Sequence, residues 1–237
     1  MTVDIFLRSY RKDFQFLKYA LQSIHKYATG FRDIIVAVPI GEAQYLEGIT
    51  TEKVIEVESW EDDYLCQQYH KLTAYKYSNA DRFLMWDSDL FAKEPITPDD
   101  YAVDGKPIIY KTKYELAGTA ICWQPITEKA LAKKVEWEFM RRHGLNFHRE
   151  TLKSFGLYME LLHGKTLKEY IKEQPYRQFS EFNVIGAYCD KFESDKYTFI
   201  DTQSVEMPPE KLRQFWSWGT VEKNMDEINA ILNGSAN

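Results

Sequence analysis

The segment Arg82-Phe-Leu-Met-Trp-Asp87-Ser88-Asp89-Leu90-Phe91 decides both the fold and the site that the sequence predicts. Its apolar stretch is typical of a buried β-strand, and two aspartates follow, one residue apart. In open α/β sheets, ligands bind beyond the carboxyl ends of the strands. Two carboxylates at such an end repel each other unless a cation accompanies them. The pattern therefore favours a hard divalent cation, Mn²⁺ or Mg²⁺, which could hold a diphosphate and neutralise it as a leaving group.

The residues before this segment alternate between strand and helix patterns. Continuous or alternating apolar runs predict strands at 3–7, 33–39 and 53–58. Apolar residues at helical spacing predict one helix through 17–27 and a second that begins at Asp62 or Asp63. The order β-α-β-β-α-β predicts an α/β, Rossmann-like fold with a mostly parallel central sheet flanked by helices.

The remaining residues give a less regular pattern. The sequence predicts strands at 107–111, 119–124 and 197–201, and helices from Thr127 to about His143, from Thr166 to before Pro175, from Ser180 through Cys189, and over 221–232. The Thr166 helix opens with a capping box, because Glu169 lies three residues later. Since no linker-like stretch divides the chain, we expect one domain over residues 1–232 and a disordered tail at 233–237.

Composition and charge narrow the class of protein. The chain has 237 residues, 44% hydrophobic and 28% charged, as in ordinary globular domains. Its net charge of −6 makes nucleic acid an unlikely partner, since proteins that bind the nucleic-acid backbone usually carry a basic face. We interpret the short basic pairs Lys133-Lys134 and Arg141-Arg142 as solvated helix faces.

The chain carries no sequence signal for a membrane or for secretion. No apolar run approaches the roughly 18 residues of a transmembrane segment, and residues 1–10 do not have the pattern of a signal peptide. Cys66, Cys122 and Cys189 are odd in number and far apart, which predicts buried free thiols instead of a disulfide framework or a zinc cluster. We therefore expect a cytoplasmic protein.

Several of these stretches resemble the GT-A class of nucleotide-sugar glycosyltransferases. The resemblance rests on the first strand with Arg8-Ser9-Tyr10, the helix with Gln67-Gln68 and Lys71-Leu72, and Asp87-Ser88-Asp89 after its strand. In addition, Ser180-Glu181-Phe182-Asn183 is similar to a signature of small bacterial and viral transferases of that class. The resemblance implies a GT-A fold, a nucleoside-diphosphate sugar as donor, and usually Mn²⁺.

The resemblance also implies roles for individual residues. Asp87 would face the ribose or a metal-bound water beside Ser88, and Asp89 would ligate the metal. Arg8 to Tyr10 would border the nucleotide. Many members of the class have a third metal ligand, often a late histidine, whereas no histidine follows His163 here.

Glu181 is our first choice for the general base that takes the proton of the acceptor hydroxyl. Its alternative role is a first-turn glutamate that complements the helix dipole. Asp201, at the end of the last predicted strand, is the reserve base or the missing metal ligand. Lys71 could reach the donor diphosphate or the sugar, and its alternative is a surface lysine. These residues do not decide between inversion and retention.

Two further groups of residues have a functional and a structural interpretation. Trp216 and Trp218 lie beside Gly219 and could close over the donor, because aromatic faces stack on sugars and bases. They could equally cover the core. His148-Arg149 could contact phosphate or acceptor, but such a pair is more often structural.

The sequence therefore predicts a metal-dependent glycosyltransferase, with a UDP-sugar as the expected donor and a glycan or another hydroxyl compound as acceptor. The alternative is a non-catalytic GT-A-like domain that binds a nucleotide sugar or a glycan without turnover. Other enzyme classes fit less well, since the first strand is followed by no Gly-rich turn and carries no D-x-D of the phosphatase type.

Overall fold

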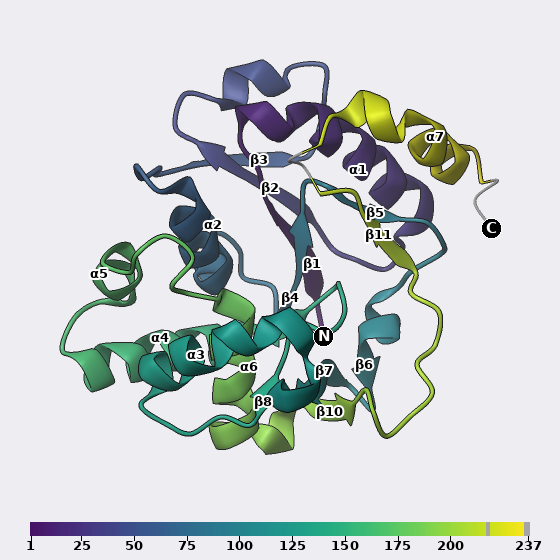
Figure 1. Ribbon diagram of the computed structural model, residues 1–237. Helices are drawn as coiled ribbons and strands as arrows, with labels where there is room; N and C mark the ends of the chain where they lie inside the picture. The colour runs from purple at the N-terminus through teal and green to yellow at the C-terminus, as the bar shows by residue number, and fades with distance from the viewer. Residues whose placement is uncertain (217–218, 235–237) are drawn as a thin grey trace.

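The computed structural model describes residues 1–216 and 219–234. Figure 1 shows a twisted sheet in the middle of the molecule with helices on both of its faces. The helices and strands follow in the order β1 (Val3–Arg8), α1 (Phe14–Tyr27), β2 (Ile34–Pro39), β3 (Lys53–Val57), α2 (Asp63–Leu72), β4 (Arg82–Asp87), β5 (Leu90–Ala92), β6 (Ala102–Val103), β7 (Lys106–Lys113), α3 (Trp123–Leu131), β8 (Trp137–Glu138), β9 (Asn146–His148), α4 (Arg149–His163), α5 (Leu167–Lys172), α6 (Glu181–Phe192), β10 (Thr198–Asp201), β11 (Leu212–Gln214) and α7 (Met225–Asn233).

The central sheet has the strand order β3-β2-β1-β4-β9. Strands β1 to β4 are parallel and β9 is antiparallel to β4, so the predicted α/β class with a mostly parallel sheet is confirmed. In the register of β1 with β4, Arg8 lies opposite Asp87. The ends of these two strands therefore bring an arginine and the first aspartate of the D-S-D segment to the same edge of the sheet.

The two faces of the sheet carry different helices (Figure 1). On one face, Leu7 and Trp86 pack with Leu17 of α1, and α7 in turn packs on α1. On the other face, Phe6 and Phe83 pack in a cluster with residues of α2 and α6. This division follows from the alternation of side chains along a strand, which sends neighbouring residues to opposite faces.

Two smaller sheets flank the central one. One has the order β10-β7-β6, with β8 also paired to β7, and the other pairs β5 with β11 in antiparallel fashion. The β5–β11 pair joins the residues that follow the D-S-D segment to the C-terminal part of the chain. It places Gln214 opposite Leu90.

The predicted strand at 119–124 and the predicted helix from Thr127 to about His143 are both wrong. Residues Gly118–Cys122 form a 3-10 helix that leads into α3, which ends at Leu131. Thr127 does not cap a helix: it lies buried within α3, where its hydroxyl donates to the Trp123 carbonyl. The helix ends early because Ala132 takes a left-handed conformation with φ of +49°.

Helix α4 was not predicted, although its sequence carries the signal. Leu152, Phe155 and Met159 are buried at helical spacing. The residue before the helix, His148, gives no side-chain cap. The start of α4 is set instead by its junction with β9, where the Arg149 amide donates to the Asp81 carbonyl.

The structure also tests the predictions for the start of α2, the three cysteines and the end of the chain. Asp62 is the N-cap of α2, since its side chain accepts a hydrogen bond from the Leu65 amide. Cys66 and Cys189 are buried free thiols as expected, whereas Cys122 is exposed, which corrects that prediction. Helix α7 extends to Asn233, so the prediction that this residue belongs to a disordered tail is wrong, and residues 235–237 lie outside the described part of the chain.

Among the described residues, no helix combines the length and the apolar character that crossing a membrane requires.

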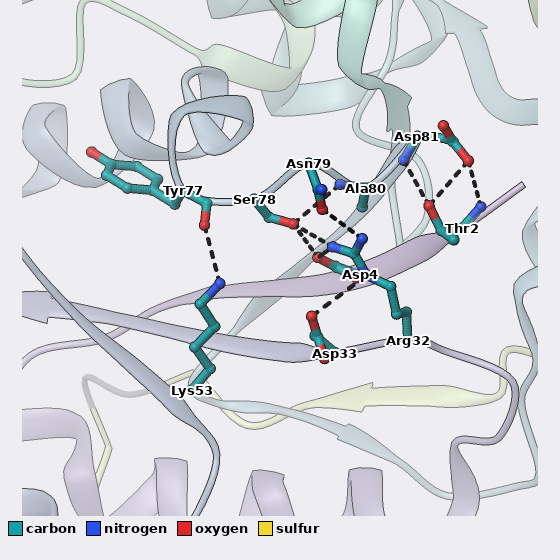
Figure 2. Close-up of polar contacts among 10 residues, drawn as sticks. All are labelled: Thr2, Asp4, Arg32, Asp33, Lys53, Tyr77, Ser78, Asn79, Ala80 and Asp81. Atoms are coloured by element: carbon teal, nitrogen blue, oxygen red, sulfur yellow. Dashed lines mark hydrogen bonds and ion pairs between the residues drawn. The ribbon is translucent and has the colours of Figure 1, made fainter.

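A buried charge cluster lies near the amino end of β1 (Figure 2). Asp4 is 0% exposed and binds Arg32 through two hydrogen bonds, of 2.9 Å from Nε and 2.7 Å from Nη2. Ser78 also donates to Asp4, and Arg32 donates to Asn79 and Ser78. These contacts tie β1 to the loop before β2, which carries Arg32, and to the turn before β4, which carries Ser78 and Asn79. The cluster therefore fixes the end of the sheet opposite to the D-S-D segment.

Candidate functional site

A cavity of about 660 Å³ lies at the carboxyl ends of β1 and β4. Its walls come from α2, the first turn of α6, the loop 140–145 and the end of β11. Most of the residues that the sequence singled out line it: Arg8, Tyr10, Lys71, Asp87, Ser88, Asp89, Glu181 and Trp216. The edge of the sheet predicted to bind ligands is thus the edge that carries this cavity.

Some predicted site residues do not line this cavity. Ser9 is buried, and its amide donates to the Ala37 carbonyl within the sheet. Asp201 ends β10 in a different sheet, where its carboxylate accepts a hydrogen bond from the Gln203 amide. His148 packs against Tyr197. Trp218 lies outside the described residues.

A buried lysine lies between two carboxylates at the centre of the site. The Lys71 ammonium is 2.6 Å from Asp87 Oδ1 and 3.2 Å from Glu181 Oε1. Lys71 and Glu181 are 4% and 7% exposed, while the Asp87 side chain is 32% exposed toward the cavity. Lys71 is therefore not the surface lysine of the alternative interpretation, because α2 turns it inward.

The charges of this group affect one another strongly. Burial lowers the pKa of Lys71, but Asp87 and Glu181 outweigh burial and raise it above its ordinary value, so the ammonium stays protonated. Burial raises the pKa of Glu181, and repulsion from Asp87 adds to this, while Lys71 opposes it. One cation thus serves two carboxylates.

Helix α6 is held against α2 at its first residue. The Glu181 amide donates to Gln68 Oε1 over 3.0 Å. Ser180 occupies the N-cap position that the sequence predicted, but its hydroxyl does not cap the helix and instead donates to the Met140 sulfur. The orientation of Glu181 therefore depends on α2, since Gln68 and Lys71 of the same helix hold its amide and its carboxylate.

The second half of the D-S-D segment is held by residues far away in the chain. Ser88 donates to Asp13 over 3.3 Å, and Asp89 Oδ1 accepts from Gln214 Nε2 over 3.1 Å. The Asp89 carbonyl also accepts a hydrogen bond from the Phe215 amide over 2.9 Å. The segment after β4 is thus fixed by β11 and by the turn that precedes α1.

The carboxylate oxygens that line the cavity are of the kind that a hard divalent cation prefers as ligands. Burial raises the pKa of Tyr10, and the charges of Asp13, Asp63 and Asp89 raise it further, which reflects the negative charge around the phenol. Within residues 1–216 and 219–234, no three histidine, cysteine or acidic side chains converge as a metal-binding set. Mg²⁺ is typically held by one or two carboxylates together with substrate phosphates and water. Asp87 and Asp89 are compatible with that kind of shared site.

The structure also adds cationic residues that the sequence interpretation missed. Arg141, Arg142 and His143 line the cavity from the loop 140–145, and Arg177 lines it from the turn before α6. The interpretation of Arg141-Arg142 as a solvated helix face is wrong, because this stretch is not helical.

A glycine provides the signal that could have indicated this loop. Gly144 has φ of +79°, and an added Cβ would lie 2.3 Å from the Tyr101 ring. Only glycine combines that conformation with so close a neighbour. The predicted helix to about His143 would place Gly144 just past a helix end, whereas Gly144 lies in a non-helical loop whose residues 140–145 line the cavity.

Arg8 is fixed by an acidic residue of α2. Its Nη2 donates to Asp63 Oδ1 over 2.7 Å, and the arginine side chain is almost fully buried. A second hollow of about 570 Å³ adjoins the cavity and shares Asp63, Tyr64 and Tyr176 with it. Arg8 thus positions the wall between the two hollows.

No protein-family model matches this chain, and no curated protein matches it. Among solved structures, the chain is similar to the apo-form glycosyltransferase GlyE of Streptococcus pneumoniae TIGR4, with 12% sequence identity and a TM-score of 0.49. The similarity covers 86% of this chain and 46% of that chain, so this chain spans less than half the length of the protein it matches.

Proposed function

We propose that this protein is a metal-dependent glycosyltransferase of the GT-A type. It would move a sugar from a nucleoside-diphosphate donor, with a UDP-sugar expected, to a glycan or another hydroxyl acceptor. One observation carries the proposal: a cavity at the carboxyl ends of β1 and β4 holds Asp87, Asp89, Lys71 and Glu181 together.

Asp87 and Asp89 would hold the cation, Mn²⁺ or Mg²⁺. When bound, the cation would supply positive charge to the diphosphate and so stabilise it as a leaving group. Arg177, at the rim of the cavity, would contribute further positive charge to the phosphates. Tyr10 and Arg8, at the end of β1, would border the nucleoside.

In a transfer with inversion, Glu181 would act as the general base. The acceptor hydroxyl gives its proton to the Glu181 carboxylate while its oxygen forms a bond to the anomeric carbon of the donor. The bond from that carbon to the phosphate oxygen breaks, and its electron pair leaves with the diphosphate. The raised pKa of Glu181 suits it to this task, since a stronger base accepts the proton more readily.

Lys71 would stabilise the charges of Asp87 and Glu181 in the absence of ligand. Because it lies between them, it would also hold the base at a fixed distance from the proposed cation site. In this proposal Lys71 acts only through these two carboxylates, whereas the sequence predicts that it could reach the donor diphosphate or the sugar directly.

The same ion pairs also favour the second candidate, a domain that binds a nucleotide sugar or a glycan without turnover. A base that stays paired with a buried ammonium is held back from its acceptor. The two candidates differ in one measurable property: a transferase hydrolyses its donor slowly when metal is present and no acceptor is added, whereas a binding domain leaves the donor intact.

Thermal unfolding with UDP, GDP, CDP and dTDP, each with Mn²⁺ and with EDTA, tests the donor site. A diphosphate at a hundred times its dissociation constant should stabilise the protein by about 2.7 kcal/mol. We expect this for one diphosphate, only with metal. If none of the four shifts the unfolding transition with metal, the proposal is wrong.

A further inference from the structure

A chain of hydrogen bonds connects the segment 207–216 with the D-S-D segment. Glu210 Oε1 lies 2.7 Å from His143 Nδ1, and His143 Nε2 lies 2.8 Å from Gln214 Oε1. Gln214 Nε2 in turn donates to Asp89 Oδ1 over 3.1 Å. The chain therefore ends on one of the two aspartates that we propose for the cation.

The direction of these hydrogen bonds follows from the two carboxylates, Glu210 and Asp89, at which the series begins and ends. An ionised carboxylate only accepts, so Asp89 requires the amide NH₂ of Gln214. The amide oxygen of Gln214 then faces His143, which must donate through Nε2–H. Because Glu210 is a carboxylate as well, His143 Nδ1 must also donate. Both ring nitrogens of His143 thus carry protons, and His143 is an imidazolium.

The surroundings of His143 favour this charged form. Burial lowers the pKa of His143, but the hydrogen bond and charge of Glu210, the hydrogen bond to Gln214 and the charge of Asp87 together raise it above its ordinary value. Arg142, which precedes His143 in the sequence, donates to the Pro208 carbonyl over 2.7 Å. The acidic groups that face the ring therefore outweigh this nearby cation.

Further contacts hold Gln214, the residue that donates the hydrogen bond to Asp89, in place. Gln214 lies opposite Leu90 in the β5–β11 pair, and the next residue, Phe215, donates its amide to the Asp89 carbonyl. The same short strand therefore holds both the main chain and the side chain of Asp89.

We propose that His143 and Gln214 are positioning residues, which orient the Asp89 carboxylate for the cation of a bound metal–nucleoside diphosphate complex. This inference rests on the proposed function. A neutral His143 would keep only one ring N–H group and could donate to only one of Glu210 and Gln214. The Gln214 amide could then turn over and place its oxygen against Asp89, which would misalign the carboxylate.

The test compares Gln214→Met with Gln203→Met. Methionine keeps the length of glutamine without its hydrogen bonds. Gln203 is an exposed glutamine of the turn after β10, outside the cavity, and serves as the matched control. Mn²⁺ binding in the presence of UDP is measured from the electron paramagnetic resonance signal of free Mn²⁺.

We expect Gln214→Met to weaken Mn²⁺ binding by about 10- to 100-fold, the usual effect of removing a group that orients a metal ligand. The control should stay within about two-fold of wild type, because a surface substitution away from a site usually has an effect no larger than that. If Gln214→Met also stays within that range, the positioning role is refuted.

Glu210→Gln gives a readout that a merely structural role would not produce. Without the Glu210 charge the pKa of His143 falls, so this variant should bind Mn²⁺ and UDP more weakly than wild type at about pH 8 and nearly as well at about pH 6, on either side of the ordinary histidine pKa. An equal loss at both pH values contradicts the proposal.

Nitrogen-15 NMR of His143 in the ligand-free protein separates this inference from the proposed function. At neutral pH both ring nitrogens should show imidazolium shifts. If wild type does not bind Mn²⁺ and UDP at all, the proposed function fails, and this measurement still decides the direction of the hydrogen bonds. A single protonated ring nitrogen overturns the inference.

Discussion

Two buried charge clusters lie at opposite ends of the same parallel strands, and they differ in how their charges are balanced. At the amino end, Asp4 is matched by one guanidinium that binds both of its oxygens, and Ser78 adds a further donor (Figure 2). At the carboxyl end, one ammonium serves both Asp87 and Glu181 beside a cavity of about 660 Å³.

The difference shows what distinguishes a structural cluster from a candidate active site. A buried carboxylate whose hydrogen bonds are all made within the protein has no capacity left for a ligand. A cluster that has more carboxylates than cations and is open to a cavity is stabilised when it binds a cation or a proton. We therefore expect substitutions at the amino end to change stability, and those at the carboxyl end to change binding and catalysis.

The largest expected effect is that of Asp89→Asn at the carboxyl end. Turnover should be abolished, because the neutral amide lacks the negative charge with which a carboxylate binds a hard cation. The melting temperature of the metal-free protein should hardly change, since asparagine can still accept the hydrogen bond from Gln214. Assays of sugar transfer and thermal unfolding with EDTA check both parts. An active variant that melts several degrees lower would make Asp89 a structural residue.

The next effect in size is that of Glu181→Gln. Donor binding should persist, while transfer should fall by about two to four orders of magnitude, the scale for loss of a general base. Single-turnover assays at saturating donor measure this loss. Glu173→Gln, at the exposed end of α5, is the control and should transfer like wild type. Full transfer by Glu181→Gln would mean that another residue takes the proton.

Asp4→Asn, at the amino end of the parallel strands, should lower stability and leave donor binding unchanged. The substitution removes the buried carboxylate from Arg32 and leaves it only the partly exposed Asp33, 3.5 Å away. This should lower the free energy of unfolding by about 3 kcal/mol, the lower end of the range for breaking a buried ion pair. We choose the lower end because the Arg32 side chain is 31% exposed. Urea unfolding checks the value. Donor binding by the folded protein should be unchanged, and a loss of binding would remove the distinction between the two clusters.

The smallest effect is a shift in the pH dependence of transfer. Since burial and Asp87 raise the pKa of Glu181, the acidic limb of the rate should have its midpoint above 4.5, the ordinary value. The rate should fall as the pH falls through this midpoint, because a protonated Glu181 cannot accept a proton. The limb should disappear in Glu181→Gln. An acidic limb retained in that variant would belong to a different group.

Parts of the site could be predicted because each depends on a local pattern. The strand before Asp87 and the helix through Lys71 were visible in the spacing of apolar residues, and the ends of parallel strands share an edge of the sheet. The loop that carries Arg141 and His143 could not be predicted in this way. Its path depends on Gly144 and on Tyr101, a packing partner that local periodicity does not indicate.

The parallel α/β arrangement and the position of Asp87 and Asp89 at a strand end could be predicted from the amino-acid sequence, because hydrophobic periodicity and turn residues act within short stretches of chain. Which charged side chains meet depends instead on how the strands and helices pack in the folded protein. Lys71 and Glu181 are separated by 110 residues, and His143 and Gln214 by 71. Such pairs form when strands and helices dock, and their strength depends on how much water the docking removes. The D-S-D segment was therefore readable from the sequence, whereas the groups that hold and balance it became visible only in the folded chain.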